Sequence, residues 1–192
     1  MSETSQMAVC RQLLAKEKAV KERTGLITFQ GMPLTLVGDG LSAGDKAPDF
    51  SLLDNDLGPV SLSSFKGKVC LLVTVPSLDT PVCDMETRRF NEEASTLGPD
   101  VAVLAISMDL PFAQKRWCGA AGIEQVKTLS DHRDASFGEA YGVLVKELRL
   151  LARAVFVVDQ KGTVRYEQIV GEITNEPDYE AALSAAKNLV KG

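Results

Sequence analysis

The chain has 192 residues, of which 45% are hydrophobic and 24% charged, so it is long enough for one domain with a full core and is not disordered as a whole. Its net charge of −5 and the lack of a long basic run argue against a nucleic-acid partner. The first residues are polar, and the sequence holds no apolar run of signal-peptide or membrane-spanning type. We therefore expect a cytoplasmic protein that does not enter a membrane.

Cysteine usage also limits the class of protein. The four cysteines, Cys10, Cys70, Cys83 and Cys118, are too few and too widely spaced for a secreted disulfide framework. None of them forms a Cys-x-x-Cys pair, which argues against a general disulfide reductase. In a reducing compartment, any disulfide of this chain would be transient and functional.

The N-terminal part predicts an extension followed by a hairpin. Apolar residues at helical spacing predict a helix from about residue 6 to residue 24, with Gly25 as its stop. Two short β-prone pieces between Leu26 and Val37 predict a β-hairpin. We therefore divide the chain into a helical extension of residues 1–25 and a domain of residues 26–192.

The next stretch alternates between strands and helices. Residues 69–75 and 101–107 are nearly continuous apolar runs of the kind found in buried strands, and residues 81–97 between them predict a helix. The residues that this helix is expected to turn toward the core are Val82, Met85, Phe90, Ala94 and Leu97. A strand, a helix and a strand in this order imply a right-handed parallel crossover.

The C-terminal half predicts three more helices and three more strands. The helices are expected over residues 111–120, 134–141 and 177–190, and the strands over residues 126–129, 154–158 and 163–170. Asp134 and Gly142 are the expected cap and stop of the middle helix. The turn sequence of residues 159–162 predicts that the last two strands form an antiparallel hairpin.

This order of elements predicts a fold class. A βαβ unit followed by a β-hairpin and a closing helix is the arrangement of a thioredoxin-like α/β fold. We therefore expect a central mixed sheet flanked by helices, with an N-terminal β-hairpin and an added N-terminal helix.

Cys83 lies where the first buried strand gives way to a helix. Thr80 is a favourable N-cap residue and Pro81 a favourable first helical residue, which places Cys83 in the first turn of the helix. In that turn, free backbone N–H groups and the helix dipole favour an anion. Cys83 is therefore a candidate reactive thiolate.

Three segments of the chain carry a family resemblance. They are residues 76–91, with a Pro-x-x-x-Thr-x-x-Cys pattern, residues 109–118, which end at Cys118, and residues 152–154 around Arg153. Together they resemble the thiol peroxidases, a group of atypical two-cysteine peroxiredoxins. The likeness runs from about Leu26 to the C-terminus, and residues 172–179 add a further family-like stretch.

The resemblance implies a role for each matching position. Cys83 matches the peroxidatic cysteine, which attacks the peroxide and becomes a sulfenic acid, and Cys118 matches the resolving cysteine, which then forms a disulfide with it. Thr80 matches the hydroxyl that orients the thiolate and the peroxide. Pro76 matches the proline that shields the pocket, and Arg153 matches the guanidinium that holds the thiolate and the peroxide oxygens.

The resemblance also implies substrates and partners. The substrates would be hydrogen peroxide and organic hydroperoxides, the reductant would be thioredoxin, and the assembly would be a homodimer. No flavin, haem, nicotinamide or other cofactor is needed for this chemistry. The added N-terminal helix and the short link of residues 146–151 depart from the family pattern and bear on the subunit interface rather than on the chemistry.

Two alternatives remain at this point. Cys118 could be idle in a one-cysteine peroxidase, or the same oxidation could serve a redox sensor or holdase. If Cys118 resolves, local unfolding is expected, because Cys118 lies on a different predicted helix from Cys83 and a disulfide needs Cα atoms about 4.4–6.8 Å apart.

Other reactive side chains have simpler interpretations. Cys70 lies within a predicted strand and is expected in the core, and Cys10 is expected to be a spectator. Arg88 and Arg89 are expected to be solvated helix charges. His132 is the single histidine and has no cluster of ligands around it in the sequence, so a metal site is not expected.

Overall fold

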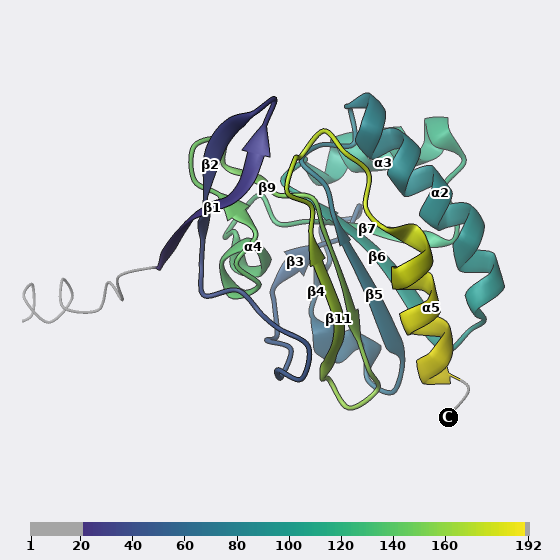
Figure 1. Ribbon diagram of the computed structural model, residues 1–192. Helices are drawn as coiled ribbons and strands as arrows, with labels where there is room; N and C mark the ends of the chain where they lie inside the picture. The colour runs from purple at the N-terminus through teal and green to yellow at the C-terminus, as the bar shows by residue number, and fades with distance from the viewer. Residues whose placement is uncertain (1–20, 191–192) are drawn as a thin grey trace, which may run out of the picture.

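A seven-stranded mixed sheet forms the centre of the molecule in the computed structural model, which describes residues 21–190 (Figure 1). In spatial order its strands are β11 (Val164–Ile169), β10 (Ala154–Val158), β5 (Val69–Thr74), β6 (Val101–Ser107), β7 (Val126–Ser130), β3 (Leu52–Leu53) and β4 (Pro59–Val60). Strands β5, β6 and β7 are parallel, whereas β10 is antiparallel to both β5 and β11. The parallel crossover and the β10–β11 hairpin predicted from the sequence are confirmed.

Helices α2 (Pro81–Leu97), α3 (Pro111–Ala121) and α5 (Tyr179–Val190) cover one face of this sheet (Figure 1). Helix α4 (Ser136–Ala140) and a second sheet lie on the side of the other face, and a short 3-10 helix η1 (Leu62–Phe65) precedes β5. The second sheet consists of β1 (Glu22–Phe29), β2 (Met32–Val37), β8 (Leu144–Val145) and β9 (Leu150–Leu151). Among residues 21–190, no helix has the length and apolar character needed to cross a bilayer.

Two hydrophobic clusters pack against the opposite faces of the central sheet. Side chains alternate along a strand, so Leu71 and Val73 of β5 face α2 and α5, whereas Cys70 and Leu72 face the other cluster. The prediction that Cys70 is a core residue is confirmed. Burial raises the pKa of the Cys70 thiol to about 11, which keeps this cysteine protonated.

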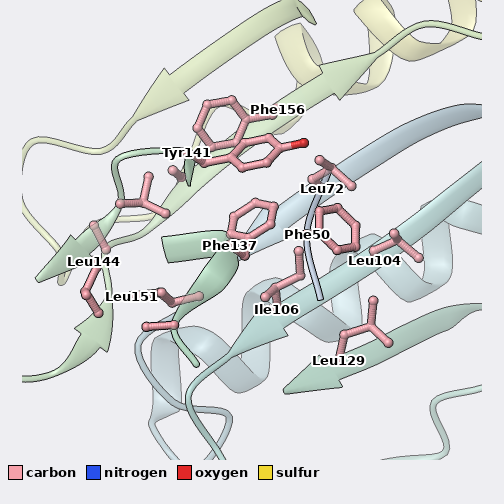
Figure 2. Close-up of a cluster of buried hydrophobic side chains, with 14 of the residues drawn as sticks. Phe50, Leu72, Leu104, Ile106, Leu129, Phe137, Tyr141, Leu144, Leu151 and Phe156 are labelled. Carbon is pink, nitrogen blue, oxygen red and sulfur yellow. The ribbon is translucent and has the colours of Figure 1, made fainter. Parts of the chain in front are cut away.

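Four aromatic rings fill the cluster on the side of α4 (Figure 2). Phe137 stacks on Tyr141 with ring centroids 4.0 Å apart and meets Phe50 edge-on at 5.5 Å. Tyr141 meets Phe156 of β10 edge-on at 5.3 Å. These contacts fix α4 on the central sheet, because offset and edge-to-face rings add to the free energy of apolar burial.

The N-terminal hairpin is confirmed, but the helix predicted before it ends too late. Most of the predicted helix lies outside the described residues, whereas residues from Glu22 onward belong to β1. Gly25, the predicted helix stop, lies at an irregularity in the β1–β2 pairing and has a φ of +76°, which glycine adopts without strain. The division of the chain at residue 25 stays a prediction.

The cap predicted for the short helix α4 is wrong. The helix starts at Ser136, and Asp134 instead forms an exposed ion pair with Arg133. The carboxylate of Asp131 accepts hydrogen bonds from the N–H groups of Phe137 and Gly138, at 3.1 and 2.8 Å. Asp131 therefore satisfies the free N–H groups at the start of α4, while Gly142 follows its end as predicted.

The aromatic cluster predicts a large effect on stability. Phe137→Ala is expected to lower the free energy of unfolding by about 3–5 kcal/mol, because it removes a buried ring and leaves a cavity. Phe112→Ala is the matched control, since the Phe112 side chain is 66% exposed and its loss is expected to change stability by less than about 0.5 kcal/mol. Urea titrations that give equal losses for both variants would contradict this description of the core.

Candidate active site

The candidate site forms where the carboxyl end of β5 meets the start of β10. Strand β10 is antiparallel to β5, with Ala154 opposite Thr74, so Arg153 lies beside the residues that follow β5. The Thr74 hydroxyl donates to the carbonyl oxygen of Ala152 at 2.7 Å and ties the two strands together there. The topology of the sheet therefore brings Arg153 and Cys83 to one place although 70 residues separate them.

Cys83 lies in the first turn of α2 and is fully buried. Thr80 is at the N-cap position with extended backbone angles, and Pro81 is at the first helical position, as predicted. The Thr80 side chain does not cap the helix, because its hydroxyl donates to the carbonyl oxygen of Ser77 at 3.0 Å. The first-turn N–H groups thus remain available to an anion at the sulfur.

Arg153 supplies a positive charge to this sulfur. Its side chain is 2% exposed, and its Nη2 lies 3.4 Å from the Sγ of Cys83. Its Nη1 donates to Oε2 of Glu86, and its Nε donates to the carbonyl oxygen of Ile173 at 2.9 Å. One planar guanidinium therefore has three fixed contacts, of which one is the candidate nucleophile.

Glu86 is the second buried ionisable side chain of the site. Burial raises the pKa of Glu86 to about 7, although attraction to Arg153 acts in the opposite direction. Among residues 21–190, its Oε1 has no hydrogen-bond partner, which favours the neutral carboxyl. Burial alone would lower the pKa of Arg153, but attraction to Glu86 and Cys83 outweighs burial and raises it. Arg153 therefore remains charged over the whole pH range in which Glu86 titrates.

Asp109 fixes the loop that precedes α2. Its carboxylate accepts hydrogen bonds from the backbone N–H of Leu78 and the hydroxyls of Ser77 and Ser107, each at 2.8 Å. Pro76 is buried at the start of this loop. These contacts tie the loop to the end of β6 and set where α2 begins.

Cys118, unlike Arg153, has no hydrogen bond to Cys83 among the described residues and contacts other side chains. Its sulfur lies 3.3 Å from Thr128 Oγ1 and 3.9 Å from Asn55 Nδ2, and it lines a cavity of about 360 Å³. Both Cys118 and Cys83 are free thiols. The structure therefore describes the reduced state, with the two sulfurs in contact with different partners.

Two hydrogen bonds hold α3 against α2. The indole Nε1 of Trp117 donates to Oδ1 of Asp84 at 2.9 Å, and Nη1 of Arg88 donates to the carbonyl oxygen of Ala121 at 2.9 Å. Arg89 lies over the ring of Tyr179, 3.9 Å from its centroid. Both arginines are exposed on α2 and outside the buried site, as the sequence predicts.

Sequence reasoning missed Glu86 and was wrong for Met85, whereas Phe90 and Leu97 are buried as predicted and Ala94 packs against the same cluster. Met85, predicted to face the core, is 51% exposed. The fully buried positions of the first three turns are Cys83, Glu86, Thr87 and Phe90. Their spacing of three, four and seven residues is the helical signal, which was hidden because two of the four side chains are polar.

His132 contacts a hydroxyl group. Its Nδ1 lies 2.9 Å from the hydroxyl of Ser130. In the part of the chain that the structure describes, no three or more His, Cys, Asp or Glu side chains form a group that could hold a metal ion.

Comparison with known proteins decides the family. Residues 42–183 match the model of the Redoxin family. The chain is 62% identical over 165 residues to the thiol peroxidase of Bacillus subtilis (strain 168). This alignment covers 86% of this chain and 98% of the relative. The chain belongs to the thiol peroxidase family. It is a peroxiredoxin-type peroxidase. A second relative, the thiol peroxidase of Staphylococcus aureus (strain MRSA252), is 58% identical to this chain, and the alignment covers 85% of this chain and 98% of that protein.

Solved structures agree with this membership of the thiol peroxidase family. A peroxiredoxin-like protein from Aquifex aeolicus superposes with a TM-score of 0.81 at 43% identity, over 88% of this chain and 98% of that one. A thiol peroxidase from Chromobacterium violaceum superposes with a TM-score of 0.76 at 23% identity, over 86% of this chain and 97% of that one. This superposition shows that the two proteins share a fold. The predicted thioredoxin-like fold is thereby confirmed.

The raised pKa of Glu86 predicts how stability depends on pH. The unfolded chain ionises Glu86 near pH 4.5, whereas the folded protein retains the proton up to about pH 7. The free energy of unfolding therefore falls as the pH rises through this window, by about 3 kcal/mol. Glu86→Gln removes the titrating carboxyl and with it this loss of stability. As the pH rises from 4.5 to about 8, the free energy of unfolding of the variant is therefore expected to rise relative to that of the parent.

Urea titrations of the reduced proteins at both pH values provide the measurement. Glu92→Gln is the control for the loss of an exposed carboxyl from the same helix, and its curve is expected to run parallel to that of the parent. A difference between the parent and Glu86→Gln that is equal at both pH values would show that Glu86 has no raised pKa.

Proposed function

We propose that this peroxidase reduces hydrogen peroxide and organic hydroperoxides through Cys83, forms a disulfide between Cys83 and Cys118, and is recycled by thioredoxin. The observation that carries the proposal is the buried sulfur of Cys83 in the first turn of α2, 3.4 Å from Nη2 of Arg153. A thiolate there has a counterion and a helix N-terminus beside it. The name of the relatives, thiol peroxidase, agrees with this chemistry.

The proposed first step is a displacement at oxygen. The Cys83 thiolate attacks one oxygen of the hydroperoxide, the O–O bond breaks, and the sulfur becomes a sulfenic acid while the departing alkoxide or hydroxide takes a proton. Arg153 is positioned to donate a hydrogen bond to the oxygens. The Thr80 hydroxyl orients the peroxide, and the buried ring of Pro76 shields the pocket from water.

Thiolate formation alone does not explain a fast peroxidase. Lowering a thiol pKa from about 8.5 to about 6 raises its thiolate fraction at neutral pH about 30-fold. With a Brønsted coefficient of about 0.45, the same change lowers its nucleophilicity about 13-fold, so the net gain is only about twofold. The larger contribution must come from donors aimed at the breaking O–O bond, and Arg153 is such a donor.

The proposed second step joins the two cysteines. The Cys118 sulfur attacks the sulfenic sulfur of Cys83, which forms the disulfide and releases water. A dithiol of thioredoxin then reduces this disulfide by exchange, so electrons pass through sulfur alone and no cofactor takes part. We further propose, from the family resemblance, that the protein acts as a homodimer in the cytoplasm.

Substitution of each cysteine tests the proposal. Cys83→Ser is expected to lower peroxide consumption by at least about 10³-fold, because it removes the nucleophile. Cys118→Ser is expected to consume one equivalent of peroxide and then stop in the presence of thioredoxin. Cys70→Ala is the control and is expected to keep full turnover, since the Cys70 side chain lies in the core on the opposite face of β5.

Stopped-flow kinetics with hydrogen peroxide and cumene hydroperoxide, followed by peptide mapping, measure these outcomes. Full thioredoxin-supported turnover of Cys118→Ser would instead support a one-cysteine peroxidase. Slow peroxide consumption by the parent, together with oxidation-dependent binding of a partner protein, would support a sensor or holdase.

The reduced structure predicts what limits disulfide formation. We expect Cys118 to reach Cys83 by a movement of α3, and the bond from Trp117 to Asp84 opposes this movement. Trp117→Phe removes that bond and is expected to speed disulfide formation about tenfold, since a hydrogen bond to a charged group contributes about 1.5 kcal/mol or more. The same variant is expected to form less sulfinic acid at high peroxide.

Rapid quenching, alkylation and mass spectrometry measure both products. Lys115→Gln is the control, because its exposed ion pair with Asp56 also links α3 to another segment but contributes little in water. An unchanged rate of disulfide formation in Trp117→Phe would show that this bond does not limit the movement of α3.

A further inference from the structure

The β1–β2 hairpin is attached to the segment of residues 171–174 by backbone hydrogen bonds. The N–H of Thr28 donates to the carbonyl oxygen of Gly171 at 2.7 Å, and the N–H of Ile173 donates to the carbonyl oxygen of Thr28 at 2.9 Å. These two bonds form a short parallel bridge between β1 and a segment that belongs to neither sheet. The position of the segment therefore depends on the hairpin.

The carboxylate of Glu172 adds a second attachment. Its Oε2 accepts hydrogen bonds from the Thr28 hydroxyl at 2.7 Å and from the N–H of Gly31 at 3.1 Å. Its Oε1 accepts from the N–H of Gln30 at 3.0 Å and from the Thr174 hydroxyl at 2.8 Å. These donors, with the Gly31 N–H foremost, lower the pKa of Glu172 to about 2, so the side chain is an anion under all working conditions.

The same segment, together with Val170 before it, is hydrogen-bonded to Arg153. The N–H of Val170 donates to the carbonyl oxygen of Arg153 at 2.9 Å, and Nε of Arg153 donates to the carbonyl oxygen of Ile173, also at 2.9 Å. Ile173 is thus held by Thr28 through its N–H and holds Arg153 through its oxygen. A chain of hydrogen bonds therefore runs from Thr28 of β1 through Ile173 to the guanidinium beside Cys83.

We propose that Glu172 is a positioning residue for the peroxidase reaction. By fixing residues 171–174 on the hairpin, it fixes the carbonyl oxygen of Ile173 and, through it, the plane of the Arg153 guanidinium. The inference rests on the proposed role of Cys83 and Arg153. Glu172 acts from the hairpin side of the molecule and does not touch the reacting atoms.

The geometry of Arg153 explains why this attachment matters. Glu86 and Cys83 bind the two terminal nitrogens, and only the bond from Nε to Ile173 fixes the base of the planar group. Without it, the guanidinium can rotate about the two remaining contacts. A displacement of about 1 Å in a positioning group costs up to about 10²-fold in rate, and a partial loosening is expected to cost about tenfold.

Glu147 provides a matched control, because its side chain binds β2, the other strand of the same hairpin. Its two carboxylate oxygens accept hydrogen bonds from the N–H of Thr35 at 3.1 and 3.0 Å, and the Thr35 backbone bond foremost lowers its pKa. It lies between β8 and β9, and its hydrogen bonds to Thr35 do not involve Ile173, whose carbonyl oxygen binds the Arg153 side chain. Both glutamates therefore fasten the hairpin, but only Glu172 adjoins the residue that holds the Arg153 guanidinium.

The experiment measures the second-order rate constant for oxidation of the reduced full-length protein by hydrogen peroxide in stopped flow. Glu172→Ala is expected to lower this rate constant about tenfold, whereas Glu147→Ala is expected to stay within about twofold of the parent. Thr28→Val, which removes one donor to Glu172 without changing charge, is expected to give a smaller loss in the same direction. It keeps the test decisive if Glu172→Ala does not fold.

A double-mutant cycle separates positioning from a general structural effect. In an Arg153→Lys background, no Nε–H is left for Ile173 to hold, so adding Glu172→Ala is expected to lower the rate constant no further. An unchanged rate constant in Glu172→Ala, an equal loss in Glu147→Ala, or a full additional loss in the Arg153→Lys background would each overturn the inference. If the parent itself does not react with peroxide through Cys83, the proposed function fails instead.

Discussion

The site depends on one buried guanidinium that faces two acidic groups. Arg153 contacts Glu86 and Cys83 with its two terminal nitrogens, and all three side chains are almost completely buried. In a medium of low dielectric constant, a single positive charge stabilises two anions less well than one. Burial raises the pKa of Glu86 to about 7, so part of this carboxyl is neutral near pH 7 and then does not compete for the charge of Arg153.

The fold brings these groups together through strand direction rather than through sequence proximity. Because β10 runs antiparallel to β5, its first residues lie beside the last residues of β5, and Arg153 meets the first turn of α2. Asp109 holds the loop before α2, and the Ile173 carbonyl holds Arg153 from the opposite side. The hairpin that fixes Ile173 thus contributes to the site, although no residue of the hairpin is close to Cys83 in the sequence.

The sequence predicts the main elements because their signals are local. The apolar runs of β5 and β6, the Thr80-Pro81 helix start and the turn of residues 159–162 each specify structure within a few residues. The two-residue strands β3, β4, β8 and β9 were not predicted, because two residues show no periodicity and form strands only by pairing with distant partners. The carbonyl oxygen of Ile173 was missed for a related reason, since a backbone acceptor leaves no trace in residue type. Arg153 was found only through the family resemblance.

The most direct test asks whether Arg153 acts on the breaking O–O bond or only on the thiolate. The rate constants of Cys83 with hydrogen peroxide and with iodoacetamide, measured for the parent and for Arg153→Lys at one pH, separate the two effects, because alkylation needs a thiolate but breaks no O–O bond. We predict that the peroxide rate constant falls about 10²-fold and the alkylation rate constant by less than about tenfold. Equal losses in the two reactions, or no loss in either, would contradict a guanidinium that stabilises the departing oxygen.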